Sequence, residues 1–214
     1  SHSVLPFGRR LACSGPSHAG VYETPAGTVA AARPPSRRRA GVRGVVEVFA
    51  AASRSWDVKL GLFGLNMGPS SEPGRLAATV RALEAAGFDS VWAGEHVVLP
   101  DPQAPPSPLA PHEPVLDPLV ALTWAAAHTT SLRIATGIVI LPQRNPVVLA
   151  KQVASLDALS HGRLTLGVGV GYLEPEFRAI GADFEHRGAI TDDYLEAMGH
   201  LWYDEHPEFH GRFA

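Results

Sequence analysis

Two polar residues of different chemistry, Glu95 and His96, directly follow a short apolar stretch, residues 90–93. That stretch is predicted to be a buried strand, and α/β folds carry their chemistry on polar side chains beyond such strand ends. An imidazole ordinarily titrates near neutral pH, so the pair suits an acid–base role or contact with a cofactor. The alternative is a surface pair, or a histidine that hydrogen-bonds a backbone carbonyl.

Three glycines, Gly167, Gly169 and Gly171, alternate at the end of a later apolar stretch. Glycines at a strand end let the backbone approach a ligand and expose N–H groups to phosphate. The spacing is not that of the dinucleotide fingerprint G-x-G-x-x-G, and tight packing in a barrel wall is the alternative. Tyr172, which follows, either covers a ligand or packs on the next helix.

Gly137 interrupts another apolar stretch between Thr136 and Ile138. A glycine inside a strand indicates a bulge or a close backbone approach, with a simple packing glycine as the alternative. His206 and His210 are spaced like metal ligands on a helix, but Pro207 lies between them, so a solvated connector is expected and no metal site is predicted.

The elements that must position these residues alternate regularly along the chain. Since strands followed by helices of this length are typical of parallel βαβ units, we expect an α/β fold. It is either a doubly wound sheet or the first half of a (β/α)8 TIM-type barrel, because a whole barrel needs about 250 residues. The first strand is expected to be buried on both faces. The predicted strands are 58–64, 88–93, 132–141 and 163–170; the predicted helices are 72–86, 117–128, 145–160, 174–180 and 186–203.

Residues 1–56 differ from the remainder, since they carry eight arginines and only two acidic residues. A transit peptide and a nucleic-acid-binding arm both fit this composition, but we expect a disordered basic extension outside the fold. The net charge of −3 and the absence of a long apolar run argue against nucleic-acid and membrane partners. The single cysteine suits a reducing compartment, so a cytoplasmic location is expected.

Three segments taken together, residues 86–96, 135–146 and 156–171, resemble the luciferase-like monooxygenase superfamily, most closely its branch dependent on the deazaflavin coenzyme F420. The resemblance extends over about residues 57–213. It implies that residues 57–214 form the N-terminal half of a (β/α)8 TIM barrel with about four βα units, and that the cofactor binds at the C-terminal rim of the strands. F420 is the expected cofactor, and FMN is the alternative, because flavin-using members also carry a Glu-His pair.

The resemblance also implies residue roles. His96 would lie beside the reacting ring and assist hydride transfer, next to Glu95, where the family usually has Asp. Thr136, Gly137 and Ile138 would contact the cofactor, with a non-prolyl cis peptide between the last two. The turn formed by Gly169, Val170, Gly171 and Tyr172 would contact its phosphate-bearing tail. The sugar-phosphate dehydrogenase branch has a glutamate at the position of Tyr172, so that activity is not inferred.

The function implied is an oxidoreductase or monooxygenase acting on a small-molecule substrate, and a homodimer of the full-length protein is compatible with it. One alternative is a truncated, catalytically incompetent half-barrel, since strands five to eight are absent from the sequence. A second is an FMN-dependent monooxygenase that uses O₂ and paired donors. A metal-dependent hydrolase built on His96, His112 and acidic residues is the least favoured.

Overall fold

The computed structural model describes residues 58–214 and one further strand, β1 (Leu11–Ala12). β1 pairs in parallel with β6 (Leu164–Gly169). Apart from β1, the basic extension predicted for residues 1–56 lies outside the described residues, so its disorder stays a prediction.

The described strands form one parallel sheet, in which the strand order follows the sequence apart from β1, which lies beside β6. Four of them lie side by side in the order β2 (Gly61–Phe63), β3 (Ser90–Ala93), β4 (Arg133–Thr136), β6. β5 (Val139–Ile140) also pairs with β6, and every pairing is parallel. Consecutive βα units whose strands are neighbours make the wall of a barrel, whereas a doubly wound sheet reverses its strand order.

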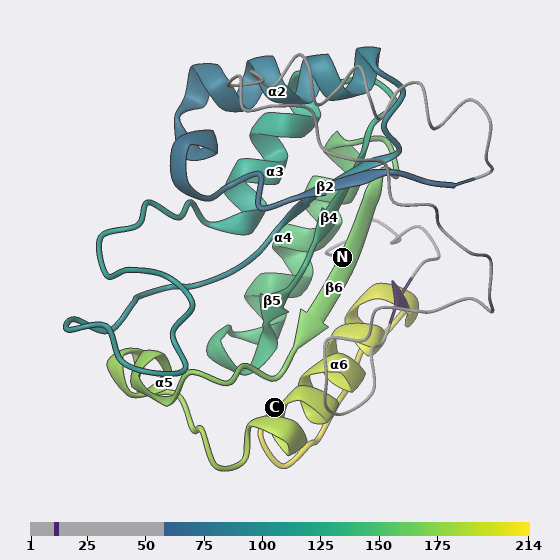
Figure 1. Ribbon diagram of the computed structural model, residues 1–214. Coiled ribbons are helices and arrows are strands. Elements are labelled where there is room, and N and C mark those ends of the chain that lie inside the picture. Colours follow the sequence, from purple (N-terminus) through teal and green to yellow (C-terminus); the bar gives the residue numbers. More distant parts are fainter. Residues whose placement is uncertain (1–10, 13–57) are drawn as a thin grey trace, which may run out of the picture.

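Helices cover one face of this sheet (Figure 1). The helices that follow β2, β3 and β5 are α2 (Pro73–Ala85), α3 (Pro118–Ala127) and α4 (Pro146–Leu159). Two short 3-10 helices, η1 (Gly68–Ser71) and η2 (Leu141–Gln143), lie in the connections. Two further helices follow β6, namely α5 (Glu174–Ile180) and α6 (Arg187–Tyr203), and α6 packs against α4.

The starts of α2, α3 and α4 share one local design. In each, a proline opens the helix and the preceding residue accepts hydrogen bonds from the first free backbone amides. Asp117 and Asn145 are these caps, and their Asp-Pro and Asn-Pro dipeptides are the sequence signal for such a start. Glu72 caps α2 in the same way before Pro73. These caps explain why the helix boundaries could be predicted to within about two residues.

The core lies between the sheet and its helices. Val91 and Ala93 on β3 are fully buried against this layer, while Ser90 and Trp92, which alternate with them, face the other side. β6 alternates in the same way. No helix among the residues that the structure describes is both long and apolar enough to cross a lipid bilayer.

Two predictions about the strands were wrong. β2 is not buried on both faces, because Phe63 is 61% exposed on the side of the sheet that the helices leave open. Residues 132–141 form β4 and β5 rather than one strand. The Thr136 hydroxyl interrupts the ladder, because it accepts a bond from the Gly167 amide (2.8 Å) and donates to the Gly167 carbonyl (2.7 Å). The Gly137–Ile138 peptide bond that follows is cis, as the resemblance implied.

Figure 1 shows where the strands point. The arrow of β6 runs toward the end of the sheet where α5 and the loop after β3 lie. Because all strands are parallel, this one rim receives the residues that follow every strand.

Candidate active site

The rim brings together the three segments that sequence reasoning singled out. The Ile140 amide, after the Gly137–Ile138 bond, donates to the Glu95 carboxylate at 2.5 Å. The Tyr172 hydroxyl lies 3.5 Å from Nε2 of His96. Residues that follow β3, β4 and β6 therefore meet in one place.

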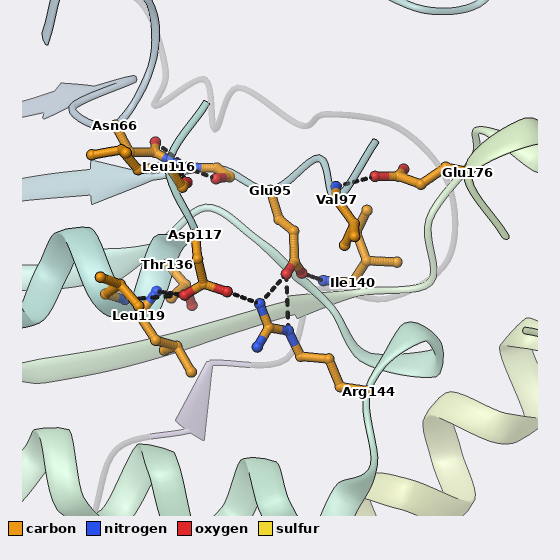
Figure 2. A network of polar contacts seen from close by, with 12 residues as sticks. Asn66, Glu95, Val97, Leu116, Asp117, Leu119, Thr136, Ile140, Arg144 and Glu176 are labelled. Carbon is orange, nitrogen blue, oxygen red and sulfur yellow. Dashed lines mark hydrogen bonds and ion pairs between the residues drawn. The ribbon is translucent and has the colours of Figure 1, made fainter. Parts of the chain in front are cut away.

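Glu95 is the buried centre of an ion-pair network, which Figure 2 shows from close by. One carboxylate oxygen accepts the Ile140 amide, and the other accepts two N–H groups of Arg144, one of them at 2.9 Å from Nε. Arg144 also donates to Asp117 at 2.6 Å, and the second oxygen of Asp117 caps α3. Both charges of this central pair come from rim loops, so the network ties the loop after β3 to the starts of α3 and α4.

The electrostatics of Glu95 follow from these contacts. Burial raises the pKa of the Glu95 carboxyl above its ordinary value, while the hydrogen bonds and positive charge of Arg144 and the Ile140 amide oppose the rise. Since N–H donors bind both oxygens and the side chain is only 2% exposed, a ligand has little access to the Glu95 carboxylate. The geometry suits a residue that positions the rim.

Asn66, after β2, makes a second buried tie. Its side chain donates to the carbonyls of Gly94 (2.8 Å) and Leu116 (2.6 Å) and accepts the Gly94 amide (3.2 Å). The residue is fully buried. Asn66 therefore hydrogen-bonds both the amide and the carbonyl of Gly94, the residue just before Glu95 and His96.

His96 lies between an acidic and a phenolic partner. Nδ1 is 3.4 Å from a carboxylate oxygen of Glu176, and Nε2 faces the Tyr172 hydroxyl. The imidazole and phenol rings meet edge to face, with centroids 6.1 Å apart. The His96 side chain is only 7% exposed, so these two partners account for both ring nitrogens.

Glu176 reaches this position from the first turn of α5. Its second carboxylate oxygen accepts the Val97 amide, as Figure 2 shows, and the side chain is fully buried. Tyr172, by contrast, is half exposed. Burial raises the pKa of the Tyr172 phenol, and the negative charge of Glu176 adds to that rise. A buried carboxylate, an imidazole and an accessible phenol therefore form one chain.

Thr136, Gly137 and Ile138 line the rim mainly by packing. Thr136 is fully buried, and its hydroxyl is used by Gly167. A Cβ on Gly137 would lie 3.2 Å from the Trp92 ring, and one on Gly169 would lie 2.7 Å from Ile138. Both glycines therefore lie directly against neighbouring side chains, as in the packing alternative given for each.

The turn after β6 combines a special backbone with exposed side chains. Gly171 has a positive φ of 77°, and a Cβ there would lie 2.6 Å from Phe177. The Arg187 guanidinium holds the turn, because it donates to the Gly171 carbonyl at 3.1 Å. Val170 and Tyr172 on either side are 43% and 50% exposed, so the turn presents apolar surface to the rim.

Sequence reasoning missed Asn66, Arg144 and Glu176 as parts of the site. Arg144 carried one usable signal, since a glutamate predicted at a buried strand end requires a cation, and Arg144 follows another strand. Glu176 carried the weaker signal of an acid in the first turn of a helix beside the rim. The sequence around Asn66 gives no signal of its role, which depends on contacts with the distant residues Gly94 and Leu116.

Two cavities lie away from Glu95 and His96. One, of about 390 Å³, is bounded by the start of α4, by α6 and by the residues after it. The other, of about 520 Å³, lies on the open face of the sheet and is lined by Phe63 and Trp92 among others. Among the described residues, no group of three or more His, Cys, Asp or Glu is placed to hold a metal ion.

Comparison with known proteins gives the same fold. The family described as luciferase-like monooxygenase matches residues 58–214. An uncharacterized protein of Mycobacterium tuberculosis is 34% identical over 146 residues, 64% of this chain and 52% of its own length. The F420-dependent glucose-6-phosphate dehydrogenase of Kineococcus radiotolerans is 32% identical over 145 residues, 66% of this chain and 40% of its own length.

Among solved structures, the monooxygenase RslO1 from Streptomyces bottropensis superposes with a TM-score of 0.58 at 31% identity. The match covers 73% of this chain and 46% of that one. The chain thus spans about half the length of the curated relatives it matches. The described residues form part of a luciferase-like TIM-type barrel, which confirms the fold predicted from the motifs.

Proposed function

This chain belongs to the luciferase-like monooxygenase family, and we propose that its function is F420-dependent oxidoreduction, with hydride transfer at the C-terminal rim of the barrel strands. The substrate in this proposal is a small molecule, and neither a nucleic acid nor a membrane takes part. The observation that carries the proposal is the placement of His96 on the rim, with Nδ1 beside the Glu176 carboxylate and Nε2 directed to Tyr172.

The rim fits a flat, mainly apolar ring system. Phe63, Val97, Val170 and Tyr172 follow or end three strands of the sheet, and each is between 43% and 61% exposed. Large apolar side chains with that exposure at the strand ends of a barrel are typical of a ligand site. The buried ties through Glu95 and Asn66 hold the loop that carries His96, which keeps such a site in one geometry.

A bound deazaflavin would supply a ring carbon that accepts or releases a hydride. The side chains named above would contact its ring, and the backbone of Gly169–Tyr172 would approach its phosphate-bearing tail. His96 would accept or donate the proton that accompanies the hydride, because its Nε2 is directed away from the buried carboxylate. F420 is preferred over FMN because the Kineococcus relative, an F420-dependent enzyme, is 32% identical.

Separate titrations with F420 and with FMN, followed by cofactor fluorescence, test the proposal. We expect saturable binding of F420 and much weaker binding of FMN. The reverse preference would support the alternative of an FMN-dependent monooxygenase, and binding of neither cofactor would contradict both.

Two histidine substitutions, one at His96 and one at an exposed control position, test the role of His96. With a panel of alcohols as hydride donors, His96→Ala should lower F420 turnover by at least about 100-fold, the usual contribution of a general acid or base. His206→Ala removes an exposed histidine that follows α6 and should leave turnover unchanged. Full turnover in His96→Ala would refute a role for this imidazole.

A further inference from the structure

Glu176 is a buried acid that sequence reasoning did not use. Its side chain is fully buried, one oxygen accepts the Val97 amide, and the other lies 3.4 Å from Nδ1 of His96. A carboxylate has no proton to donate, so the ring nitrogen that faces it must carry one. The arrangement therefore selects one of the two neutral tautomers of His96.

The other end of the imidazole meets a different kind of group. With the proton on Nδ1, Nε2 has a lone pair, and the nearest partner is the Tyr172 hydroxyl at 3.5 Å. A phenol can donate to that lone pair and still accept a hydrogen bond from a ligand. Tyr172 is half exposed, whereas His96 is nearly covered, so a ligand reaches the phenol more easily than the imidazole.

We infer that Glu176, His96 and Tyr172 form a proton relay, in which Glu176 is the positioning residue that holds the proton of His96 on Nδ1 and Tyr172 is the group that meets the substrate. The inference rests on the proposed function, which it deepens: a relay that takes up one proton while a hydride leaves fits a substrate whose oxidation releases both, namely an alcohol that becomes a carbonyl compound. It also gives a role to Glu176, which is 80 residues away from His96 in the chain.

The proton and the electrons balance in such a relay. When an alcohol is oxidised, its C–H bond breaks and the electron pair leaves as hydride, for which a bound deazaflavin would supply the accepting carbon. The hydroxyl proton passes to the Tyr172 oxygen as the Tyr172 proton passes to Nε2. The result is a carbonyl compound and an imidazolium whose charge is balanced by Glu176. The reverse sequence protonates the oxygen of a carbonyl compound.

The ¹⁵N chemical shifts of the two ring nitrogens test the tautomer without any substrate or cofactor. In the unmodified protein, at a pH where the ring is neutral, we expect Nδ1 to give the protonated signal. A signal from protonated Nε2 would overturn the inference, and this reading requires no variant.

A matched pair of substitutions on α5 tests the cause. Glu176→Gln keeps the shape but removes the carboxylate, so the Nδ1–H population should fall at least about threefold. Glu174→Gln removes the other charge of the same helical turn, which pairs with exposed Arg178, and should leave the His96 signals unchanged. Unchanged signals in a folded Glu176→Gln would contradict a positioning role.

Tyr172→Phe removes only the hydroxyl and tests the exposed end. The affinity for F420 should stay within about twofold, while kcat falls by about 100-fold or more and the ¹⁵N signal of Nε2 shifts. Full kcat would overturn the role of Tyr172. If F420 binds to none of the forms, the proposed function is refuted. The ¹⁵N measurement of the His96 tautomer does not depend on F420 and still tests the role of Glu176.

Discussion

At the scale of single residues, two buried glutamates of the rim differ in what holds them. Glu95 is surrounded by the Arg144 guanidinium and a backbone amide, so its charge is matched inside the protein. Within the described part of the chain, Glu176 is held instead by the Val97 amide and the His96 imidazole, with no guanidinium beside it. The first arrangement holds one geometry of the rim, whereas the second places an acid against the imidazole that the proposed relay uses.

Removing Arg144 should expose the cost of a buried, unmatched charge. Arg144→Met should lower the free energy of unfolding by about 3 kcal/mol, because Glu95 stays buried without its cation. The double variant Glu95→Gln/Arg144→Met should lose less than the sum of the single variants. Urea denaturation of the four forms measures this coupling.

An exposed ion pair provides the control for that cycle. Arg178 pairs with Glu174 at 2.8 Å, but its side chain is 74% exposed. Arg178→Met should therefore change stability by less than about 0.5 kcal/mol. Equal losses at positions 144 and 178 would contradict the importance of burial.

Glu84 gives a prediction with a defined pH window. Burial alone would raise its pKa, but hydrogen bonds from the amides of Ser131, Leu132 and Thr130 and the Ser131 hydroxyl outweigh burial and hold the pKa at about 2, below the ordinary 4.5. A carboxyl whose pKa is lower in the folded state stabilises the fold at pH values above its unfolded-state pKa. This stabilisation is lost as the pH falls through the folded-state pKa.

Glu84→Gln should therefore be less stable than the unmodified protein at pH 7, by about 1 kcal/mol for a partly exposed carboxylate. The difference should shrink between pH 4.5 and pH 2, where the carboxylate becomes protonated. Thermal unfolding across that range measures it, with Glu196→Gln on the exposed side of α6 as control. A constant difference down to pH 2 would argue against the charge as the cause.

At the scale of elements, the junction of β4 with β6 depends on one glycine and one threonine. Thr136 exchanges two hydrogen bonds with Gly167, and a Cβ on Gly167 would clash with the Thr136 carbonyl oxygen. Backbone atoms cannot rotate away as side chains can. The same segment carries Gly137 and Ile138 toward the rim, so the close approach of the two strands shapes the site.

The same substitution should have opposite effects in two elements. Gly167→Ala should destabilise the protein by about 2 kcal/mol, because β4 and β6 must move apart. Gly199→Ala, inside α6 and with open space around it, should stabilise by about 0.5–1 kcal/mol through helix propensity. Chemical denaturation compares the two, and an equal sign of the changes would contradict the packing argument.

At the scale of the whole molecule, the candidate site is assembled from the ends of separate strands. A ligand that contacts the residues after β3, β4 and β6 at once should bind the folded chain and not the unfolded one. At about 100 times its dissociation constant, F420 should add about 2.7 kcal/mol, which raises the unfolding midpoint by about 5–10 °C. Scanning fluorimetry measures the shift, and an equal shift with ATP would argue against a specific site.

How much of this could be read from the sequence depends on distance along the chain. The helix starts at Pro73, Pro118 and Pro146 could be predicted because a cap and its proline are adjacent residues. The strands could be predicted from short apolar stretches, and the rim position of His96 followed from its place after one of them. The break at Gly137 was indicated by a glycine inside such a stretch.

Only the tertiary structure decided which side chains meet. Glu95 finds Arg144 at a separation of 49 residues, and His96 finds Glu176 at 80, so no local periodicity records either pair. Burial also distinguishes Glu95 from Tyr172. Glu95 is buried with hydrogen bonds to both oxygens, whereas Tyr172 is half exposed. Local chemistry determined by sequence thus set the elements and their order, whereas long-range packing determined which acid holds the rim and which one faces the imidazole.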